Sequence, residues 1–257
     1  MKYIVLINPR FSHTAVGPLA HATEQYGIPD ASDIIYRGRN LVVRLRGENI
    51  VVKAFGMPGM VKGAIYGYMR RSKALRAYSN ALRLRAMGIP TPEPYFAGEV
   101  RDGLGLLRQS YYACAALDGW SELRGVEKNP DFPEIARALA EFIFNLHTHG
   151  VYMADFTPGN VLYRREGGKY LFMLVDINRM EFDVDDWNML LDNFRAMLDT
   201  AEGVAVVGRE YAKVLERSNV YHSLGNLEEE LVERYRRHTA RLLRNRKIKN
   251  LFRRKKK

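Results

Sequence analysis

One segment in the middle of the chain carries most of the information about its fold. It reads His147-Thr-His-Gly-Val-Tyr-Met-Ala-Asp155-Phe-Thr-Pro-Gly-Asn160-Val-Leu-Tyr163 and is followed by Leu174-Val-Asp176-Ile-Asn178-Arg179. Phosphoryl transfer needs such a grouping, because one carboxylate orients the acceptor hydroxyl while an amide and a second carboxylate hold Mg²⁺. The alternative is an ordinary β-hairpin, since Asp, Pro, Gly and Asn are all common turn residues.

The pattern around this segment predicts a helical second half of the chain. Residues 132–149 place apolar side chains on one face of a helix that Gly150 ends. Two strands, 160–164 and 170–176, pair through the turn Gly167-Gly168. Three further helices are expected over residues 185–198, 209–216 and 227–247.

The first part of the chain is rich in predicted strands. Short β-branched or aromatic runs cover residues 1–8, 33–36, 41–45, 50–55, 95–100 and 106–117. A helix is expected over 72–87, and three prolines make 89–94 an extended connector. This order predicts a bilobal α+β fold, with an N-lobe over 1–112, a C-lobe over 113–230 and a basic tail over 231–257.

A single lysine interrupts one of these apolar strands, Ile50-Val-Val-Lys53-Ala-Phe55. Lysine is seldom placed among buried neighbours without a partner, and in a nucleotide kinase that partner is the phosphate chain of ATP. The alternative is an edge-strand lysine that faces water. Lys53 precedes a helix, a connector, two strands and the segment that holds Asp155 and Asn160, which is the order a kinase requires. We therefore favour the nucleotide interpretation.

Taken together, these motifs resemble the lipopolysaccharide kinase (Kdo/WaaP) family of the protein-kinase-like superfamily. The resemblance spans about residues 33–182 and rests on Gly38-Arg39-Asn40, Val52-Lys53, Ser72-Lys73-Ala74, residues 88–94, Ser110-Tyr-Tyr112, residues 155–160 and residues 175–180. It implies a protein-kinase-like fold with a strand-rich N-lobe and a mainly helical C-lobe. It also implies an enzyme that uses ATP and Mg²⁺ to phosphorylate a Kdo or heptose hydroxyl of the lipid A–core saccharide at the cytoplasmic membrane face.

The resemblance also assigns roles to individual residues. Lys53 would bind the α/β-phosphates and Asp155 would orient the acceptor hydroxyl and take its proton. Asn160 and Asp176 would be the metal ligands. Gly38, Arg39 and Asn40 would cover the phosphates, although a plain hairpin turn explains this short segment equally well.

The chain departs from the family pattern at three points, of which the first and the third favour a second hypothesis, a pseudokinase that serves as a nucleotide-binding scaffold. Met153-Ala154 stands before Asp155, where relatives carry a His two residues earlier, and His147 and His149 are expected to be helix-end residues. Ile-Asn follows Asp176 instead of Phe-Gly. Ala77 stands where relatives carry a Glu, and residues 54–92 contain no acid. A carboxylate that pairs with Lys53 must therefore come from elsewhere, and Asp176 is the candidate.

The net charge of +11 comes from the C-terminal tail. Residues 231–257 hold 13 Lys/Arg against one acid, which leaves 27 basic and 28 acidic side chains in the rest of the chain. Such a tail attracts an anionic membrane surface, and residues 64–73 interleave aromatics with cations in a way that suits the same surface. A solvated basic helix is the alternative, and a nucleic-acid partner ranks last because it leaves the Asp155 loop unused.

One cysteine and the lack of a long apolar run favour a cytoplasmic protein, and the basic tail with the family resemblance implies that it is peripheral to the inner membrane. Cys114 cannot form an internal disulfide, which agrees with a reducing compartment. No run approaches the roughly 18 apolar residues that suggest a membrane span.

Overall fold

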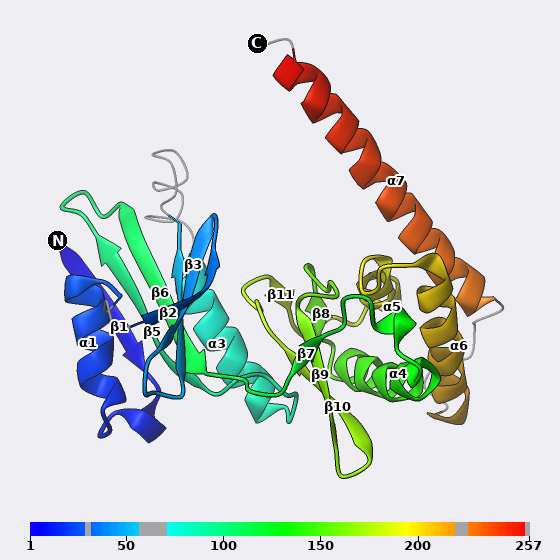
Figure 1. Cartoon of the computed structure of the whole chain (residues 1–257), viewed down its shortest axis with the longest axis horizontal. Helices are drawn as coiled ribbons and strands as arrows, with labels where there is room; N and C mark the ends of the chain where they lie inside the picture. Colours follow the sequence, from blue (N-terminus) through cyan, green and yellow to red (C-terminus); the bar gives the residue numbers. More distant parts are fainter. Residues whose placement is uncertain (29–31, 57–70, 219–225, 255–257) are drawn as a thin grey trace. The chain divides into compact units, whose positions relative to one another are not determined.

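The computed structural model describes residues 1–28, 32–56, 71–218 and 226–254, which form two units (Figure 1). Unit 1 comprises Met1–Asp118 and Asp176–Arg179, and unit 2 comprises Gly119–Val175 and Met180–Lys257. Unit 1 is rich in strands and unit 2 is mainly helical, as the sequence predicts. Of the basic aromatic stretch 64–73, residues 64–70 lie outside the described residues.

Unit 1 is built on a six-stranded antiparallel sheet with the order β1-β5-β6-β4-β3-β2. Its strands are β1 (Lys2–Ile7), β2 (Ser32–Arg37), β3 (Asn40–Leu45), β4 (Ile50–Phe55), β5 (Pro94–Arg101) and β6 (Leu107–Ala115). All six predicted strands are confirmed. The core of the sheet gathers β-branched and aromatic residues, among them Val43, Val52 and Phe96, because alternate positions of each strand face inward.

Two helices pack on this sheet. The predicted helix is α3 (Lys73–Ala86), whose N-cap Ser72 accepts the Leu75 N–H, and Gly88 follows its end at φ +73°. It buries Ala77, Tyr78 and Ala81 against β5 and β6. Helix α1 (Val16–Tyr26) follows the 3₁₀ turn η1 (Pro9–Phe11) and was not predicted, because its apolar face is short and Gly17-Pro18 interrupts the pattern.

Unit 2 is organised around helix packing. Its longer helices are α4 (Phe132–Thr148), α6 (Ala201–Ser218) and α7 (Leu227–Arg254), with α6 packed against both of the others. One expected helix, 185–198, is wrong. The chain forms the short helix α5 (Trp187–Leu191) and the 3₁₀ helix η3 (Asp192–Arg195), where Asn193 turns inward to bond a distant backbone N–H. Local periodicity cannot reveal such a long-range contact.

Short strands complete unit 2. The predicted hairpin is β9 (Val161–Glu166) and β10 (Lys169–Leu174), and both Gly167 and Gly168 have positive φ, as a tight hairpin turn requires. Strand β7 (Ser121–Glu122) pairs with β9, after which η2 (Val126–Lys128) leads toward α4. Strand β8 (Tyr152–Met153) pairs with β11 (Met180–Glu181), immediately before the Asp155 loop.

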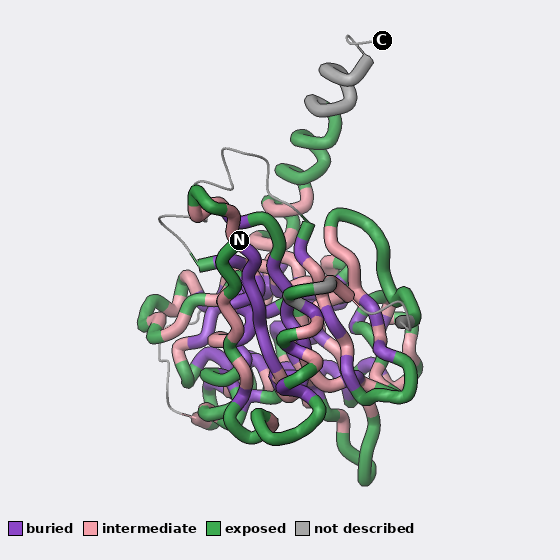
Figure 2. Tube along the Cα trace, turned by 90° about the vertical axis from the view of Figure 1, so that its left-hand side faces the viewer, coloured by how far each residue is buried: buried purple, intermediate pink, exposed green. Residues whose placement is uncertain are grey.

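The solvent exposure of helix α7 increases along its length. It begins with the buried residues Leu227 and Leu231, whereas residues 240–247 are exposed, and Figure 2 shows this part of the helix in green. No described helix combines the length and the apolarity that a membrane crossing requires.

Candidate functional site

Lys53 forms an ion pair with Asp176 inside unit 1. The Nζ atom lies 2.6 Å from Asp176 Oδ1, and the Lys53 side chain is 17% exposed. Strand β4 lies between β3 and β6, with Lys53 opposite Val42 on one side and Tyr112 on the other. The edge-strand alternative is therefore wrong, and the carboxylate that pairs with Lys53 is the one the sequence left as the candidate.

Several contacts fix the backbone that carries Asp176. Asp176 has a φ of +54°, in a left-handed region that non-glycine residues rarely occupy, although Asp tolerates it better than most. The Asn178 Nδ2 donates to Asp176 Oδ1 at 2.6 Å, and Asn80 of α3 donates from its amide to the Ile177 carbonyl oxygen at 2.7 Å. Helix α3 thus holds the Asp176 segment through an amide, although it contains no acidic residue. Sequence reasoning missed Asn80, which has no local signal.

Lys73 lies within the electrostatic influence of three cations, Arg39, Arg76 and Lys53, and of the Asp176 carboxylate, and we call these five residues the Lys53 cluster. Lys73 is the first residue of α3. Burial is the largest cause that lowers its pKa, and repulsion by Arg39, Arg76 and Lys53 adds to the effect, whereas Asp176 opposes it. Among these five side chains positive charge is in excess, which suits a ligand with several negative charges, such as a phosphate chain.

The segment Gly38-Arg39-Asn40 forms the turn between β2 and β3. Gly38 donates its N–H to the Asn40 carbonyl oxygen at 3.0 Å, and the Asn40 side chain accepts from the Gly56 N–H at 3.4 Å. A Cβ added at Gly38 would clash with the Tyr36 ring, and one at Gly56 would clash with the Arg39 carbonyl oxygen. The turn is therefore tied to the end of β4, and among the three predicted residues Arg39 alone adds charge to the Lys53 cluster.

Asp155 and Asn160 belong to the Asp155 loop, residues 153–160 of unit 2. The Asn160 side chain donates from Nδ2 to the Asp155 carbonyl oxygen at 2.8 Å, which leaves its amide oxygen directed away from that bond. The Asn160 carbonyl accepts the Val175 N–H at 2.9 Å, and Asp176 is the next residue of the chain. The Asn160 side chain thus holds the two ends of the Asp155–Asn160 segment together, and Asp155 is partly exposed.

The two histidines near this loop differ from each other. His149 caps the end of α4 as expected. His147 is buried instead, and burial lowers its pKa to about 3, so it is neutral and carries no charge for the helix dipole. Both histidines are helix-end residues as expected, since His147 lies in the last turn of α4, but the neutral His147 ring bonds to Tyr211 and Asn193.

Oxygen ligands are available for a magnesium ion. Asp176 of unit 1 has a carboxylate and Asn160 of unit 2 has an amide oxygen, and both are donor types that Mg²⁺ prefers. Within the described parts of the chain, no group of three or more His, Cys, Asp or Glu side chains could hold a metal. Each of these donor types is one that Mg²⁺ accepts beside phosphate oxygens and water in nucleotide enzymes.

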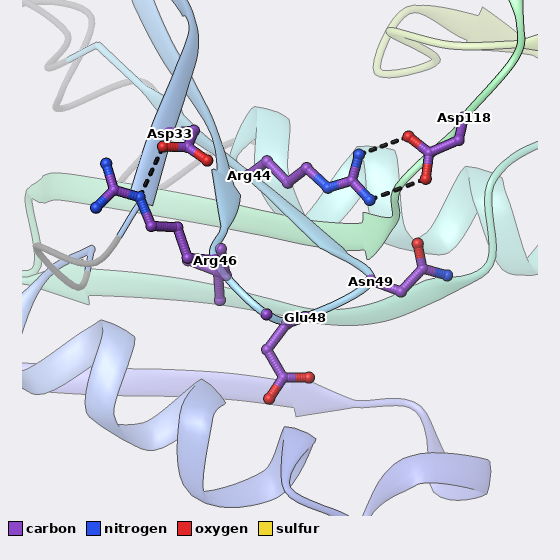
Figure 3. Close-up of a pocket in the computed structure, with 8 residues that line it drawn as sticks. Asp33, Arg44, Arg46, Glu48, Asn49 and Asp118 are labelled. Carbon is purple, nitrogen blue, oxygen red and sulfur yellow. Dashed lines mark hydrogen bonds and ion pairs between the residues drawn. The ribbon is translucent and has the colours of Figure 1, made fainter.

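A polar cavity of about 580 Å³ lies elsewhere in unit 1, at the turn between β3 and β4 (Figure 3). Arg44 donates two hydrogen bonds to the Asp118 carboxylate, at 2.5 and 2.9 Å, and Arg46 donates one to Asp33 at 2.7 Å. Its charged groups thus largely neutralise one another, and none of the predicted site residues lines it. The cavity is distinct from the Lys53 cluster.

Comparison with known proteins identifies the class of this fold. The structure of WaaP in complex with acyl carrier protein is 16% identical, with a TM-score of 0.57, and the match covers 90% of this chain and 99% of that one. Two other similar structures have TM-scores below 0.5. The Rio2 kinase of Chaetomium thermophilum is 16% identical, with a TM-score of 0.45, over 85% and 65% of the chains, and WbdD is 14% identical, with 0.43, over 79% and 43%. The chain has a protein-kinase-like fold.

A family model then gives the finer assignment. The model of the lipopolysaccharide kinase (Kdo/WaaP) family matches residues 59–217, which is more than half of the chain. The chain belongs to this family and is a kinase. A search of curated proteins found no match.

Proposed function

We propose that this kinase transfers the γ-phosphoryl group of ATP to a hydroxyl of a lipopolysaccharide inner-core sugar, Kdo or heptose, at the cytoplasmic membrane face. Family membership supports the substrate class. The observation that carries the nucleotide part is the Lys53–Asp176 ion pair at 2.6 Å, together with the charges of Lys53, Asp176, Arg39 and Arg76 that act on Lys73. The excess of positive charge in this cluster matches a triphosphate far better than a neutral ligand.

The proposed roles follow from the chemistry of each side chain. Lys53 binds the α/β-phosphates, and the turn that holds Gly38, Arg39 and Asn40 covers them. The Asp155 carboxylate accepts the proton of the acceptor hydroxyl as its oxygen bonds to the γ-phosphorus and the bond to the ADP oxygen breaks. Asp176 and Asn160 would hold Mg²⁺, which, when bound, neutralises charge on the phosphates.

The basic tail, residues 231–257, is proposed to hold the enzyme on an anionic membrane surface, so that the protein is cytoplasmic and peripheral. Each cation near such a surface contributes on the order of 1 kcal/mol, and residues 240–247 are exposed along α7. In this proposal the chain works as an N-lobe (1–112), a C-lobe (113–230) and the tail, with nucleic acid an unfavoured partner.

A pseudokinase is the second candidate, and one observation favours it. Ala77 is 3% exposed on α3, so this helix presents no carboxylate where relatives of the family have one. The Lys53–Asp176 pair argues against a pseudokinase, because it supplies Lys53 with a carboxylate from a different segment.

The two candidates are separated by binding and turnover measured on the same sample. ATP is titrated with and without Mg²⁺ by calorimetry, and phosphate transfer to lipid A–core saccharides that end in Kdo or in heptose is then followed by mass spectrometry. The kinase proposal expects Mg²⁺-dependent binding and a phosphorylated saccharide. Binding without transfer to either acceptor supports the pseudokinase.

A further inference from the structure

Two side chains of η3 hold the backbone immediately before Asp155. The Met153 N–H donates to Asn193 Oδ1 at 3.1 Å, and Arg195 donates from Nη2 to the Ala154 carbonyl oxygen at 3.2 Å. Both contacts join residues about forty positions apart in the chain. Strand β8 has only two residues, so these polar contacts add anchors that its short pairing with β11 cannot supply.

Asn193 belongs to a buried hydrogen-bond network in which the donor and the acceptor of each bond can be assigned. A backbone N–H can only donate, so Oδ1 of Asn193 faces Met153 and Nδ2 faces His147 Nε2 at 3.2 Å. The Nε2 atom therefore accepts, and Nδ1–H donates to the Tyr211 hydroxyl at 2.6 Å. This assignment needs a neutral imidazole, which agrees with the low pKa that burial gives His147. The network links α6, α4 and η3 to the strand that leads into the Asp155 loop.

The Arg195 contact continues to the C-terminal helix. Its Nη1 lies 3.2 Å from Asp192 Oδ2, while the other oxygen, Oδ1, lies 2.7 Å from Arg234 Nη1 of α7. Arg234 is 17% exposed and also donates to Glu230 Oε1 at 2.5 Å and to the Asn188 carbonyl oxygen at 2.9 Å. Asp192 thus joins two guanidinium groups, one that holds the Ala154 carbonyl and one that belongs to α7.

We propose that Asn193 and Arg195 are positioning residues for Asp155, and that Arg234 makes their hold on the Asp155 loop depend on the docking of α7. This inference rests on the proposed role of Asp155. The Asn193 and Arg195 side chains bond backbone atoms, so they act by orienting the loop and take no part in proton transfer. Small misplacements of a reacting group are costly, and one of about 1 Å can lower a rate by about 10²-fold. Because the basic tail, residues 231–257, includes most of α7, the same connection joins the proposed membrane anchor to the proposed catalytic carboxylate.

The kinetic test compares Arg195→Ala, Arg195→Lys and Arg234→Ala with wild type. Arg195→Ala is expected to lower kcat by about 10–10²-fold, with the KM for ATP changed less than about twofold. Arg195→Lys keeps the charge but loses the planar fork, so it restores only part of the rate. Combined with Asp155→Asn, Arg195→Ala is expected to add little further loss, because both changes affect the same group. Losses that multiply in the double variant would overturn the positioning role.

A second readout does not depend on activity. Hydrogen exchange of the peptide that contains Met153 and Ala154 is expected to accelerate in Arg195→Ala and in Arg234→Ala. The matched control is Arg217→Ala, which removes an arginine that pairs with Glu141 between α6 and α4. Exchange that is equal in Arg234→Ala and Arg217→Ala would overturn the link to α7. If the wild type transfers no phosphate, the proposed function fails, while the exchange result still decides the structural link.

Discussion

Lys53 and Asp176 are joined by a direct ion pair, 2.6 Å from Nζ to Oδ1, although more than 120 residues separate them in the chain. The pair gives the lysine a carboxylate that helix α3 does not contain, and Asn80 of α3 bonds the backbone next to Asp176. A lysine held in this way keeps a defined position in a site where positive charge is in excess. The predictions below test this site and its connections.

Removing the lysine is expected to disable nucleotide chemistry with little effect on folding. Lys53→Met keeps the aliphatic part of the side chain but loses the ammonium group. Because this group acts on developing phosphate charge, kcat/KM for ATP should fall by about 10²–10³-fold. Steady-state kinetics and thermal unfolding are measured together, with Lys169→Met, a change at an exposed residue of β10, as the control. Unchanged kinetics in Lys53→Met would contradict the nucleotide site.

The cations of the Lys53 cluster predict that nucleotides bind more tightly the more phosphate groups they carry. Lys73→Ala and Arg39→Ala should each weaken the binding of ATP by about tenfold, which corresponds to about 1.4 kcal/mol, and should leave adenosine binding almost unchanged. Calorimetric titrations with ATP, ADP and adenosine check this order. Arg46→Ala is the matched control, since Arg46 is exposed and pairs with Asp33. An equal loss for ATP and adenosine would mean that these cations do not face the phosphates.

Buried His147 predicts that the folded state weakens in acid. Its pKa is about 3 in the fold, against 6.5 ordinarily, so between these values only the unfolded chain binds a proton there. The free energy of unfolding therefore falls as the pH drops below 6.5, by about 2 kcal/mol from this group between about pH 7 and pH 5. Urea unfolding at several pH values measures the slope.

His147→Phe provides the comparison for this slope. It removes the titrating group, so its stability should be lower near neutral pH, where hydrogen bonds are lost, but flatter from about pH 7 to pH 5. A wild-type slope in His147→Phe would show that other groups cause the acid sensitivity.

The exposed part of α7 predicts binding to anionic vesicles that salt weakens. Gln substitutions at Arg241, Arg244, Arg246 and Lys247 remove four cations, and at on the order of 1 kcal/mol each the affinity should fall by about 10²-fold or more. Vesicle sedimentation at low and high salt measures the effect, since charge interactions are screened within about 8 Å at physiological ionic strength.

Exposed cations elsewhere in unit 2 serve as the control for the tail. Gln at Arg137, Lys213 and Arg217 removes charges that pair with glutamates on α4 and α6. These changes should leave vesicle binding intact. Binding that persists without the α7 cations, or a stronger salt-sensitive affinity for RNA than for vesicles, would contradict the membrane role.

The strands could be predicted because their signals are local, since short β-branched or aromatic runs mark each of them. The partner of Lys53 could be named in a different way, because residues 54–92 contain no acid and the resemblance to the family pointed to Asp176. The hairpin after Asn160 was equally accessible, since Gly167-Gly168 suits its turn. The roles of Gly38 and Asn40 stay predictions, because their contacts in the structure are those of a tight turn.

The other contacts between distant segments that shape the site could not be predicted. Asn193 interrupts an apolar helical pattern, and its bond to the Met153 N–H replaces the expected helix over 185–198 by α5 and η3. Asn80 and Arg195 resemble ordinary surface residues of helices until their backbone partners are known. His147 was placed by its position near the end of α4, whereas its burial depends on Tyr211 of α6.

Transfer of labelled phosphate from ATP to the lipid A–core saccharide, compared between wild type and Asp155→Asn, tests the account most directly. Asp33→Asn on β2 is the control, because it makes the same chemical change at an exposed ion pair. The account predicts a labelled saccharide with wild type and with the control. It also predicts a loss of about 10²–10⁴-fold with Asp155→Asn at unchanged ATP affinity. Transfer by Asp155→Asn at the wild-type rate, or ATP binding by wild type with no labelled saccharide, would contradict it.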